Sequence, residues 1–231
     1  VDRRTGLPDA FVQGPRMFTL DIWNHWRELA WGVYETMTLS IAAMALGLLV
    51  AIACALARNT SSTVLKRSIT VYVELIRNTP FLVQIFLVYF ALPVIGISLP
   101  EFWAGVIALA LNAAGFIAEI VRAGVGAIES GQSEAARSIG MRHSQILFHI
   151  LLPQSLRSIV PPTTNELITL VKGSALLSVI SVYELTRAGQ AIISVHFAPL
   201  EIYLLIALYY YATISALAWF SRYLERRLPA W

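Results

Sequence analysis

TMTLSIAAMALGLLVAIACALA, residues 36–57, is a run of about 22 residues without a charged side chain. At about 1.5 Å of rise per residue, a helix of this length covers the roughly 30 Å hydrocarbon core of a bilayer. Trp26, Trp31 and Tyr34 precede the run, as is typical of the aromatic belt at a membrane surface. The stretch therefore predicts a membrane span at about residues 31–57.

The composition of the whole chain supports the same interpretation. Of the 231 residues, 57% are hydrophobic and 13% are charged, whereas a soluble domain carries roughly 25% charged residues. The net charge of +3 comes from basic residues between apolar runs, so we expect no binding of nucleic acid. The single cysteine, Cys54, lies inside an apolar run, which excludes a disulfide framework within one chain.

Further apolar stretches predict an all-α bundle of about five transmembrane helices. The spans expected after the first are residues 78–100, 102–126, 158–182 and 199–222. Pro161 and Pro162 fall inside the fourth of these. Because proline lacks an N–H, we expect that span to be broken there, with freed carbonyls lining a cavity. We expect a polar connection over residues 183–198.

The distribution of basic residues predicts the orientation. Lysine and arginine are concentrated in segments 58–77, 122–157 and 222–227. By the positive-inside rule these segments lie in the cytoplasm, which puts the C-terminus inside. Segment 1–30 is then an N-terminal extracytoplasmic or interfacial segment, and the membrane domain comprises residues 31–231.

The most specific motif lies in the charged segment 127–157. It reads GQSEAARSIG at residues 131–140, and ILFHILLP follows at residues 146–153. Ser133 is expected to cap a short helix that begins at Glu134. Gly140 is expected to adopt the left-handed conformation that ends a helix and turns the chain.

This motif resembles the EAA signature of ABC importer permeases. Further segments resemble the polar amino acid branch of that family, at residues 74–80 (ELIRNTP), 118–124 (AEIVRAG) and 152–154 (LPQ). The resemblance implies that segment 127–157 is a coupling loop that docks into an ATPase. The residues implied in coupling are Glu134, Ala135, Ala136, Gly140 and Pro153. Without the resemblance, an amphipathic connector on the membrane surface is the alternative.

The resemblance also implies the partners. These are ABC ATPase subunits, an identical or homologous permease subunit and an extracytoplasmic substrate-binding protein, assembled in a bacterial cytoplasmic membrane. The sequence contains no G-x-x-x-x-G-K-[ST] run that would cradle nucleotide phosphates. We therefore expect no cofactor in this chain, with ATP and magnesium held by the partner ATPase.

Polar residues inside the expected spans are candidates for binding a polar amino acid, since charge within a membrane requires a partner or a purpose. Glu166 lies in the fourth span, and Asn165 and Thr169 share roughly its face. Arg77 and Thr79 precede Pro80. Arg77 suits a substrate carboxylate, and Glu166 suits an ammonium or a cationic side chain.

Several alternatives to this site remain open. Arg77 and Glu166 can simply pair with each other, or Arg77 can reach the cytoplasmic interface. The resemblance adds Thr38 and Ser40 to the expected pathway. Lys172 is expected to extend to the external interface.

Three other expectations concern residues outside this site and the class of the protein. Glu119 and Arg122 are expected to form a structural ion pair, and His196 to lie in an external loop. A permease for another small polar solute and a secondary transporter are the alternative functions. Four histidines and one cysteine do not supply an enzyme's catalytic groups.

Overall fold

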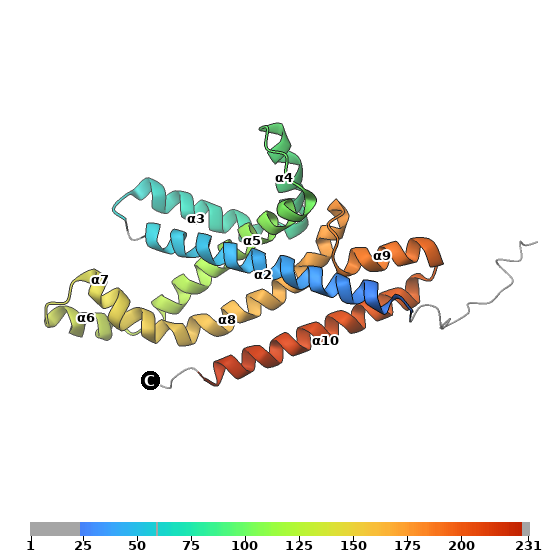
Figure 1. Cartoon of the computed structure of the whole chain (residues 1–231). Coiled ribbons are helices and arrows are strands. Elements are labelled where there is room, and N and C mark those ends of the chain that lie inside the picture. The colour runs from blue at the N-terminus through green and yellow to red at the C-terminus, as the bar shows by residue number, and fades with distance from the viewer. Residues whose placement is uncertain (1–23, 59, 228–231) are drawn as a thin grey trace, which may run out of the picture.

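The described part of the chain, residues 24–58 and 60–227 of a computed structural model, is helical and contains no strand. Four long helices run along one axis (Figure 1): α2 (Trp26–Ala57), α5 (Glu101–Gly126), α8 (Leu152–Gly173) and α10 (Pro199–Glu225). The shorter elements are α3 (Thr63–Asn78), α4 (Phe81–Val94), α6 (Ser130–Ser138), α7 (His143–Ile146), a π-helix η2 (Leu147–Leu151), a 3-10 helix η3 (Ser174–Ile180) and α9 (Leu185–His196). Most of the expected N-terminal segment 1–30 lies outside the described residues.

The described helices are compatible with three to five crossings of a membrane. Three of them, α2, α5 and α10, are each long and apolar enough to span. Two bent pairs also qualify: α3 with α4, which meet at 116°, and His143–Ile180 with α9, which meet at 45°. If each bent pair counts as one span, there are five. The all-α membrane bundle predicted from the sequence is therefore confirmed.

The centre of the bundle is the crossing of α2 and α5, where small residues allow close approach. A Cβ placed on Gly47 of α2 would lie 2.9 Å from the Cβ of Ala113 on α5. Ala43 and Ala51, one turn to either side of Gly47, are fully buried. This crossing fixes the relative position of the two helices.

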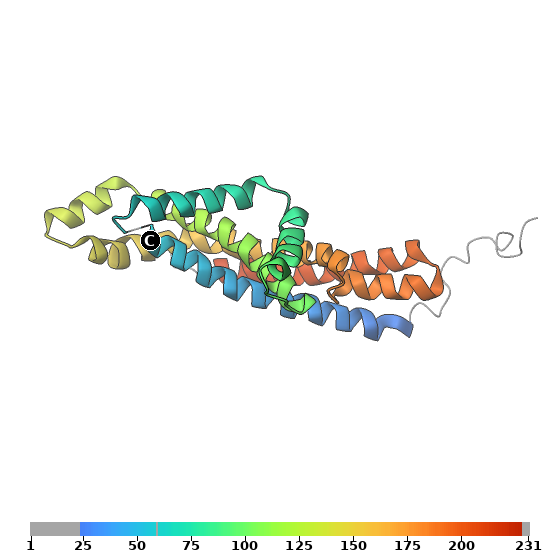
Figure 2. The ribbon, with the colours of Figure 1, turned by 90° about the horizontal axis from the view of Figure 1, so that it is seen from above.

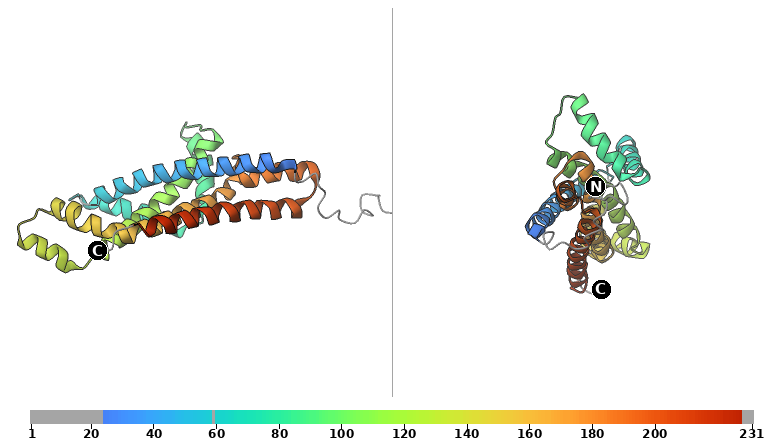
Figure 3. Two further views of the ribbon diagram at one scale, coloured as in Figure 1. Left: turned by 60° about the horizontal axis from the view of Figure 1, so that its bottom comes forward. Right: turned by 90° about the vertical axis from the view of Figure 1, so that its right-hand side faces the viewer.

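α4 projects away from the bundle, as Figure 1 and the right-hand view of Figure 3 show, and from above it points toward the viewer (Figure 2). Its outer side chains are apolar, and Leu87 and Phe90 are each 61% exposed. At 14 residues it covers only about 21 Å of a helix axis. α4 therefore needs α3, on the other side of Pro80, to complete a crossing.

The expected break at Pro161 and Pro162 is wrong, because α8 continues through both prolines. Each proline removes one backbone N–H, while contacts to neighbouring helices hold α8 on both sides of them. The Oγ of Ser158 donates to the carbonyl oxygen of Gly124 on α5 at 3.3 Å. Thr164 Oγ1 and Ser221 Oγ of α10 lie 2.7 Å apart. The regular α-helix ends instead at Gly173.

The expected polar connection over residues 183–198 is also wrong, since most of it is helix α9. Leu185, Ala188 and Ile192 fall on one face and are buried, a periodicity that the average polarity of the segment hides. A Cβ on Gly189 would lie 2.8 Å from Ile206 Cγ1 of α10. His196 is the last residue of α9 rather than a loop residue, and its ring lies 4.6 Å from that of His25.

Candidate functional site

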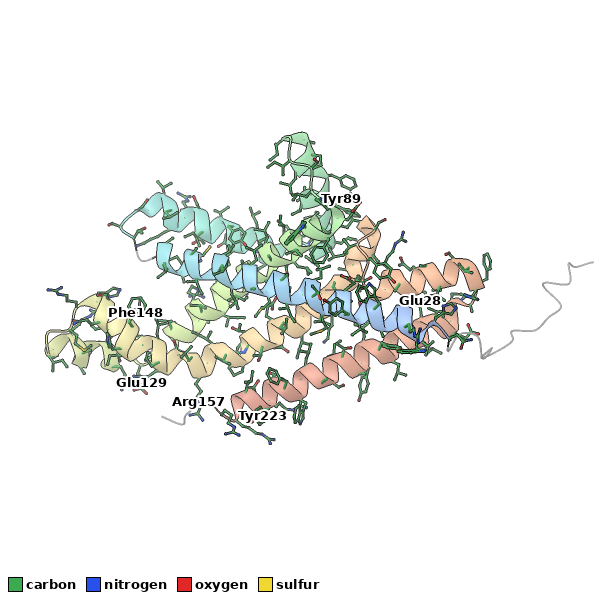
Figure 4. The ribbon with its side chains drawn as sticks, in the orientation of Figure 1. Glu28, Tyr89, Glu129, Phe148, Arg157 and Tyr223 are labelled. Atoms are coloured by element: carbon green, nitrogen blue, oxygen red, sulfur yellow. The ribbon has the colours of Figure 1, made fainter. Side chains whose placement is uncertain are left out.

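The segment predicted as a coupling loop projects from one end of the bundle, which is also where α10 ends (Figure 1). Glu129, Phe148 and Arg157 mark this end in Figure 4, and Glu28 marks the opposite one. α6 begins at Ser130, four residues before the expected start at Glu134. Glu129 occupies the N-cap position, so Ser133 is not the cap. Its Oγ donates instead to the carbonyl oxygen of Ser130 at 2.8 Å.

The chain reverses at Gly140, as predicted. Gly140 has φ +83°, in the left-handed region that other residues rarely adopt. Its N–H donates to the carbonyl oxygen of Arg137 at 2.9 Å, and the N–H of Met141 donates to that of Ala136 at 3.1 Å. These bonds satisfy carbonyls at the end of α6 and direct the chain back toward the bundle.

The coupling loop has a buried inner side and an exposed outer side. Ala136 and Ile146 are 5% and 2% exposed. Glu134, Ala135, Gly140 and Pro153 are exposed, and the apolar Ile139 is 78% exposed. Within the described ranges Glu134 makes no ion pair. An exposed carboxylate next to exposed apolar side chains is suited to contact another protein.

A buried polar network, which the sequence analysis missed, closes the corner between α3 and α4. The amide nitrogen of Gln84 donates to the carbonyl oxygens of Ile76 at 2.8 Å and Thr79 at 3.1 Å. The side-chain oxygen of Gln84 accepts from Asn112 Nδ2 of α5 at 2.9 Å. The network satisfies carbonyls at the end of α3, which Pro80 and the start of α4 leave without helical partners. Uncharged polar residues inside apolar spans were the signal for it.

A pocket of about 400 Å³ lies beside this corner, between α3, α4, α5 and α8. We call it the α8 pocket. Its polar lining residues are Thr79, Asn112, Thr169 and Lys172, and Phe81 and Phe116 are its aromatic ones. The structure thus brings together Thr79 and Thr169, two of the predicted substrate residues. It also brings Lys172 to the pocket.

The other predicted substrate residues lie off the lining of the α8 pocket. Glu166 is 8% exposed, and its Oε1 has no hydrogen-bond partner among the described residues. Ser40 is fully buried and equally unpartnered there. Asn165 is exposed next to Thr169, whose Oγ1 donates to its carbonyl oxygen at 3.2 Å, and Thr38 is half-buried. Asn165 and Glu166 thus occupy different sides of α8.

Arg77 is paired, but not with Glu166. Its guanidinium lies 3.5 Å from Glu119 Oε1, which excludes the alternative of an Arg77–Glu166 pair in this structure. The predicted pair of Glu119 with Arg122 is confirmed, since Arg122 Nε donates to Glu119 Oε2 at 2.9 Å. Glu119 therefore holds two arginines at once, from α3 and from its own helix.

A second buried carboxylate, Glu184, escaped the sequence analysis. It is fully buried at the start of α9 and accepts the N–H groups of Thr186 at 2.9 Å and Arg187 at 2.7 Å. The hydroxyl of Tyr210 on α10 donates to it at 2.8 Å. Leu185 N–H donates to Thr36 Oγ1 on α2 at 3.1 Å. This cluster links α9 to both long neighbours, which identifies Glu184 as a structural cap.

Comparison with known proteins bears on what this arrangement does. The family model described as "binding-protein-dependent transport system inner membrane component" matches residues 36–229. The probable glutamine ABC transporter permease protein GlnM of Bacillus subtilis is 38% identical, covering 85% of this chain and 91% of its own. The L-cystine transport system permease protein TcyB of the same organism is 37% identical, over 89% and 88%.

Among solved structures, the crystal structure of an amino acid ABC transporter with histidines is similar. It superposes with a TM-score of 0.86 at 37% identity, covering 90% of this chain and 98% of that one. A likeness of this extent shows that the two chains share one fold over most of their length.

Proposed function

Because the chain belongs to the family of binding-protein-dependent transport system inner membrane components, we propose that it imports a polar amino acid by alternating access. It is the permease subunit of an ABC importer, a component of the inner membrane and not itself an enzyme. The energy comes from ATP that a separate subunit hydrolyses with magnesium, so this chain needs no cofactor.

The observation that carries the proposal is the exposed side of the coupling loop. Glu134 and Ile139 project there without partners in the described structure, at the same end as the C-terminal end of α10. The helix–turn unit that ends at Gly140 is held in shape by its internal hydrogen bonds. It therefore transmits a movement of the ATPase to the bundle better than a flexible loop does. An ABC ATPase subunit is the proposed partner, and its closure moves α5 and α8, which flank the loop.

The coupling-loop end is proposed to face the cytoplasm, with the start of α2 and the N-terminus outside. The concentration of lysine and arginine near this end supports that orientation. A substrate-binding protein delivers the solute to the outer end. A second permease chain, identical or homologous, is proposed to complete the pathway.

A polar amino acid is the proposed substrate. The relatives GlnM and TcyB are named for the transport of glutamine and L-cystine, which supports this class of substrate. The polar and aromatic lining of the α8 pocket supports it as well. Thr79 and Thr169 are proposed to contact the solute in this pocket. Arg77, Asn165, Glu166, Thr38 and Ser40 are proposed to line the pathway in other states of the cycle. The unpartnered Oε1 of Glu166 supports such a change for α8, since a buried unpaired group is costly to keep.

Uptake into proteoliposomes tests the function. The permease is reconstituted with its ATPase and binding protein, and uptake of L-glutamine is followed with internal ATP. We expect uptake only when the ATPase and ATP are both present. Uptake driven by an ion gradient without the ATPase would instead identify a secondary transporter. Uptake of a non-amino-acid solute alone would support a permease for another polar compound.

The coupling loop is tested by Glu134→Lys. This variant reverses the charge on the exposed side of the loop without touching its buried side. We expect the permease to insert normally while ATP hydrolysis no longer responds to the loaded binding protein. Normal co-purification of the ATPase together with fully stimulated hydrolysis would contradict the proposed contact.

A further inference from the structure

Lys172 is an exposed charged residue in the last turn of α8, and it borders the α8 pocket. It lies next to Gly173, whose added Cβ would be 3.8 Å from Leu109 Cδ2 on α5. The neighbouring residue of α5, Ala110, places its carbonyl oxygen 3.0 Å from a Cβ on Gly47 of α2. Gly47 is near the middle of the uncharged run of α2. The backbone of Lys172 therefore lies near the level of Gly47, the middle of the span expected at residues 36–57.

The environment of Lys172 contains no balancing carboxylate. Within residues 24–58 and 60–227 Lys172 forms no ion pair, and no acidic residue lines the α8 pocket. Glu119 is occupied by Arg77 and Arg122, and Glu166 is buried off the pocket lining. A cation at this depth is costly unless it faces a cavity with water or a ligand, and the α8 pocket is that cavity.

Two of the neutral polar residues of the pocket, Thr79 and Asn112, already make hydrogen bonds within the bundle. Thr79 Oγ1 donates to the carbonyl oxygen of Leu75 at 2.7 Å and accepts from Gln84 at 3.0 Å. Asn112 donates one of its amide hydrogens to Gln84. Lys172 thus holds the only formal charge on the described lining of the pocket, with all three ammonium hydrogens available to an occupant.

We propose that Lys172 binds the carboxylate of the transported solute, and that the α8 pocket selects amino acids with neutral rather than cationic side chains. This inference rests on the proposed function. A carboxylate at the ammonium makes a charge-assisted hydrogen bond, which is stronger than a neutral one. A cationic side chain meets a wall that carries one positive charge and no negative one, so repulsion excludes it.

Equilibrium binding to the purified permease–ATPase complex in nanodiscs tests the inference, without the binding protein so that its own selectivity does not enter. The probes are L-glutamine, L-glutaminamide, which lacks the carboxylate, and L-arginine. The variants are Lys172→Gln and Lys172→Arg. Lys66→Gln is the matched control, because Lys66 is the only other lysine in the sequence and lies exposed at the start of α3.

Loss of a charge-assisted bond predicts an affinity for L-glutamine about 10- to 100-fold weaker in Lys172→Gln. We expect the wild type to bind L-glutaminamide about 10- to 100-fold more weakly than L-glutamine. Lys172→Gln does not weaken the binding of L-glutaminamide further. Lys172→Arg retains most of the affinity and Lys66→Gln all of it. L-arginine binds the wild type more weakly than L-glutamine.

Unchanged L-glutamine binding in Lys172→Gln, with folding checked by size-exclusion chromatography, would overturn the carboxylate contact. Tighter binding of L-arginine than of L-glutamine would overturn the selectivity. Failure of the proposed function can be told apart from failure of this inference. If the wild-type complex binds no amino acid and imports none with its ATPase, both proposals fall together.

Discussion

Replacing Gln84 by methionine tests the buried network at the corner between α3 and α4. The change keeps the length of the side chain and removes its amide. It leaves the carbonyl oxygens of Ile76 and Thr79 without the donor that lies 2.8 and 3.1 Å away. It also takes the acceptor from Asn112 Nδ2. We expect the corner to loosen, since this network connects both short helices to α5.

The magnitude follows from burial. Gln84 and Asn112 are each 8% exposed, and an unsatisfied buried polar group costs about 1–3 kcal/mol. Four groups lose a partner, Thr79 Oγ1 among them, but Thr79 and Asn112 border the α8 pocket, from which water reaches them. We therefore expect a loss of about 2–4 kcal/mol, less than the full sum. In a chain of this size, 1 kcal/mol lowers the unfolding midpoint by about 2–4 °C, which predicts a shift of about 4–16 °C.

Thermal unfolding in nanodiscs measures this shift, and Gln190→Met is the matched control. Gln190 is half-buried on α9 and its side chain makes no hydrogen bond with the described residues. A double-mutant cycle with Asn112→Ala isolates the link to α5, with an expected coupling energy of about 1 kcal/mol. A midpoint for Gln84→Met no lower than that of Gln190→Met would refute the reasoning.

Three further predictions follow from single positions. Gly140→Ala places a side chain at φ +83°, which costs about 1–2 kcal/mol. We expect ATP hydrolysis stimulated by the binding protein to fall. The control is Gly131→Ala, because an added Cβ there meets no atom within 4 Å, and it leaves this hydrolysis unchanged. Glu184→Ala removes a cap with two N–H bonds and a hydroxyl bond and destabilises by about 2–4 kcal/mol, measured by the unfolding midpoint; an unchanged midpoint would mean that α9 holds without its cap. Gly115→Ala sets a Cβ 2.6 Å from Ile76 Cγ2 and costs about 1–3 kcal/mol; Ile76→Ala in the same chain recovers part of it, and no recovery would contradict the contact.

Periodicity and charge predicted the helices with long uncharged runs. The free energy of moving a side chain out of water depends on that side chain and not on its neighbours. Periodicity and charge were wrong about the break at the two prolines of the fourth span and about residues 183–198. There α8 withstands two prolines through bonds to α5 and α10, and α9 forms because Glu184 caps it and Ile206 packs on Gly189. The Glu184 cap is local, but the bonds of α8 and the packing of Ile206 come from helices distant in sequence, so no local pattern indicates them.

The predicted site divides along the same line. The reversal at Gly140 and the Glu119–Arg122 pair are local, and the structure confirms both. Arg77 pairs with Glu119 and not with Glu166, and only the packing of α3 against α5 decides this.

The sequence by itself determined that the chain is a membrane bundle with a projecting charged loop, since the lack of charge over a span and the turn at a glycine are properties of the local chain. Tertiary structure alone decided which polar groups meet. It paired Gln84 with Asn112, covered Glu166 and turned Lys172 toward the α8 pocket. The physical reason is that a residue's position along a helix fixes its depth and its side, whereas its neighbour is fixed by how the helices cross.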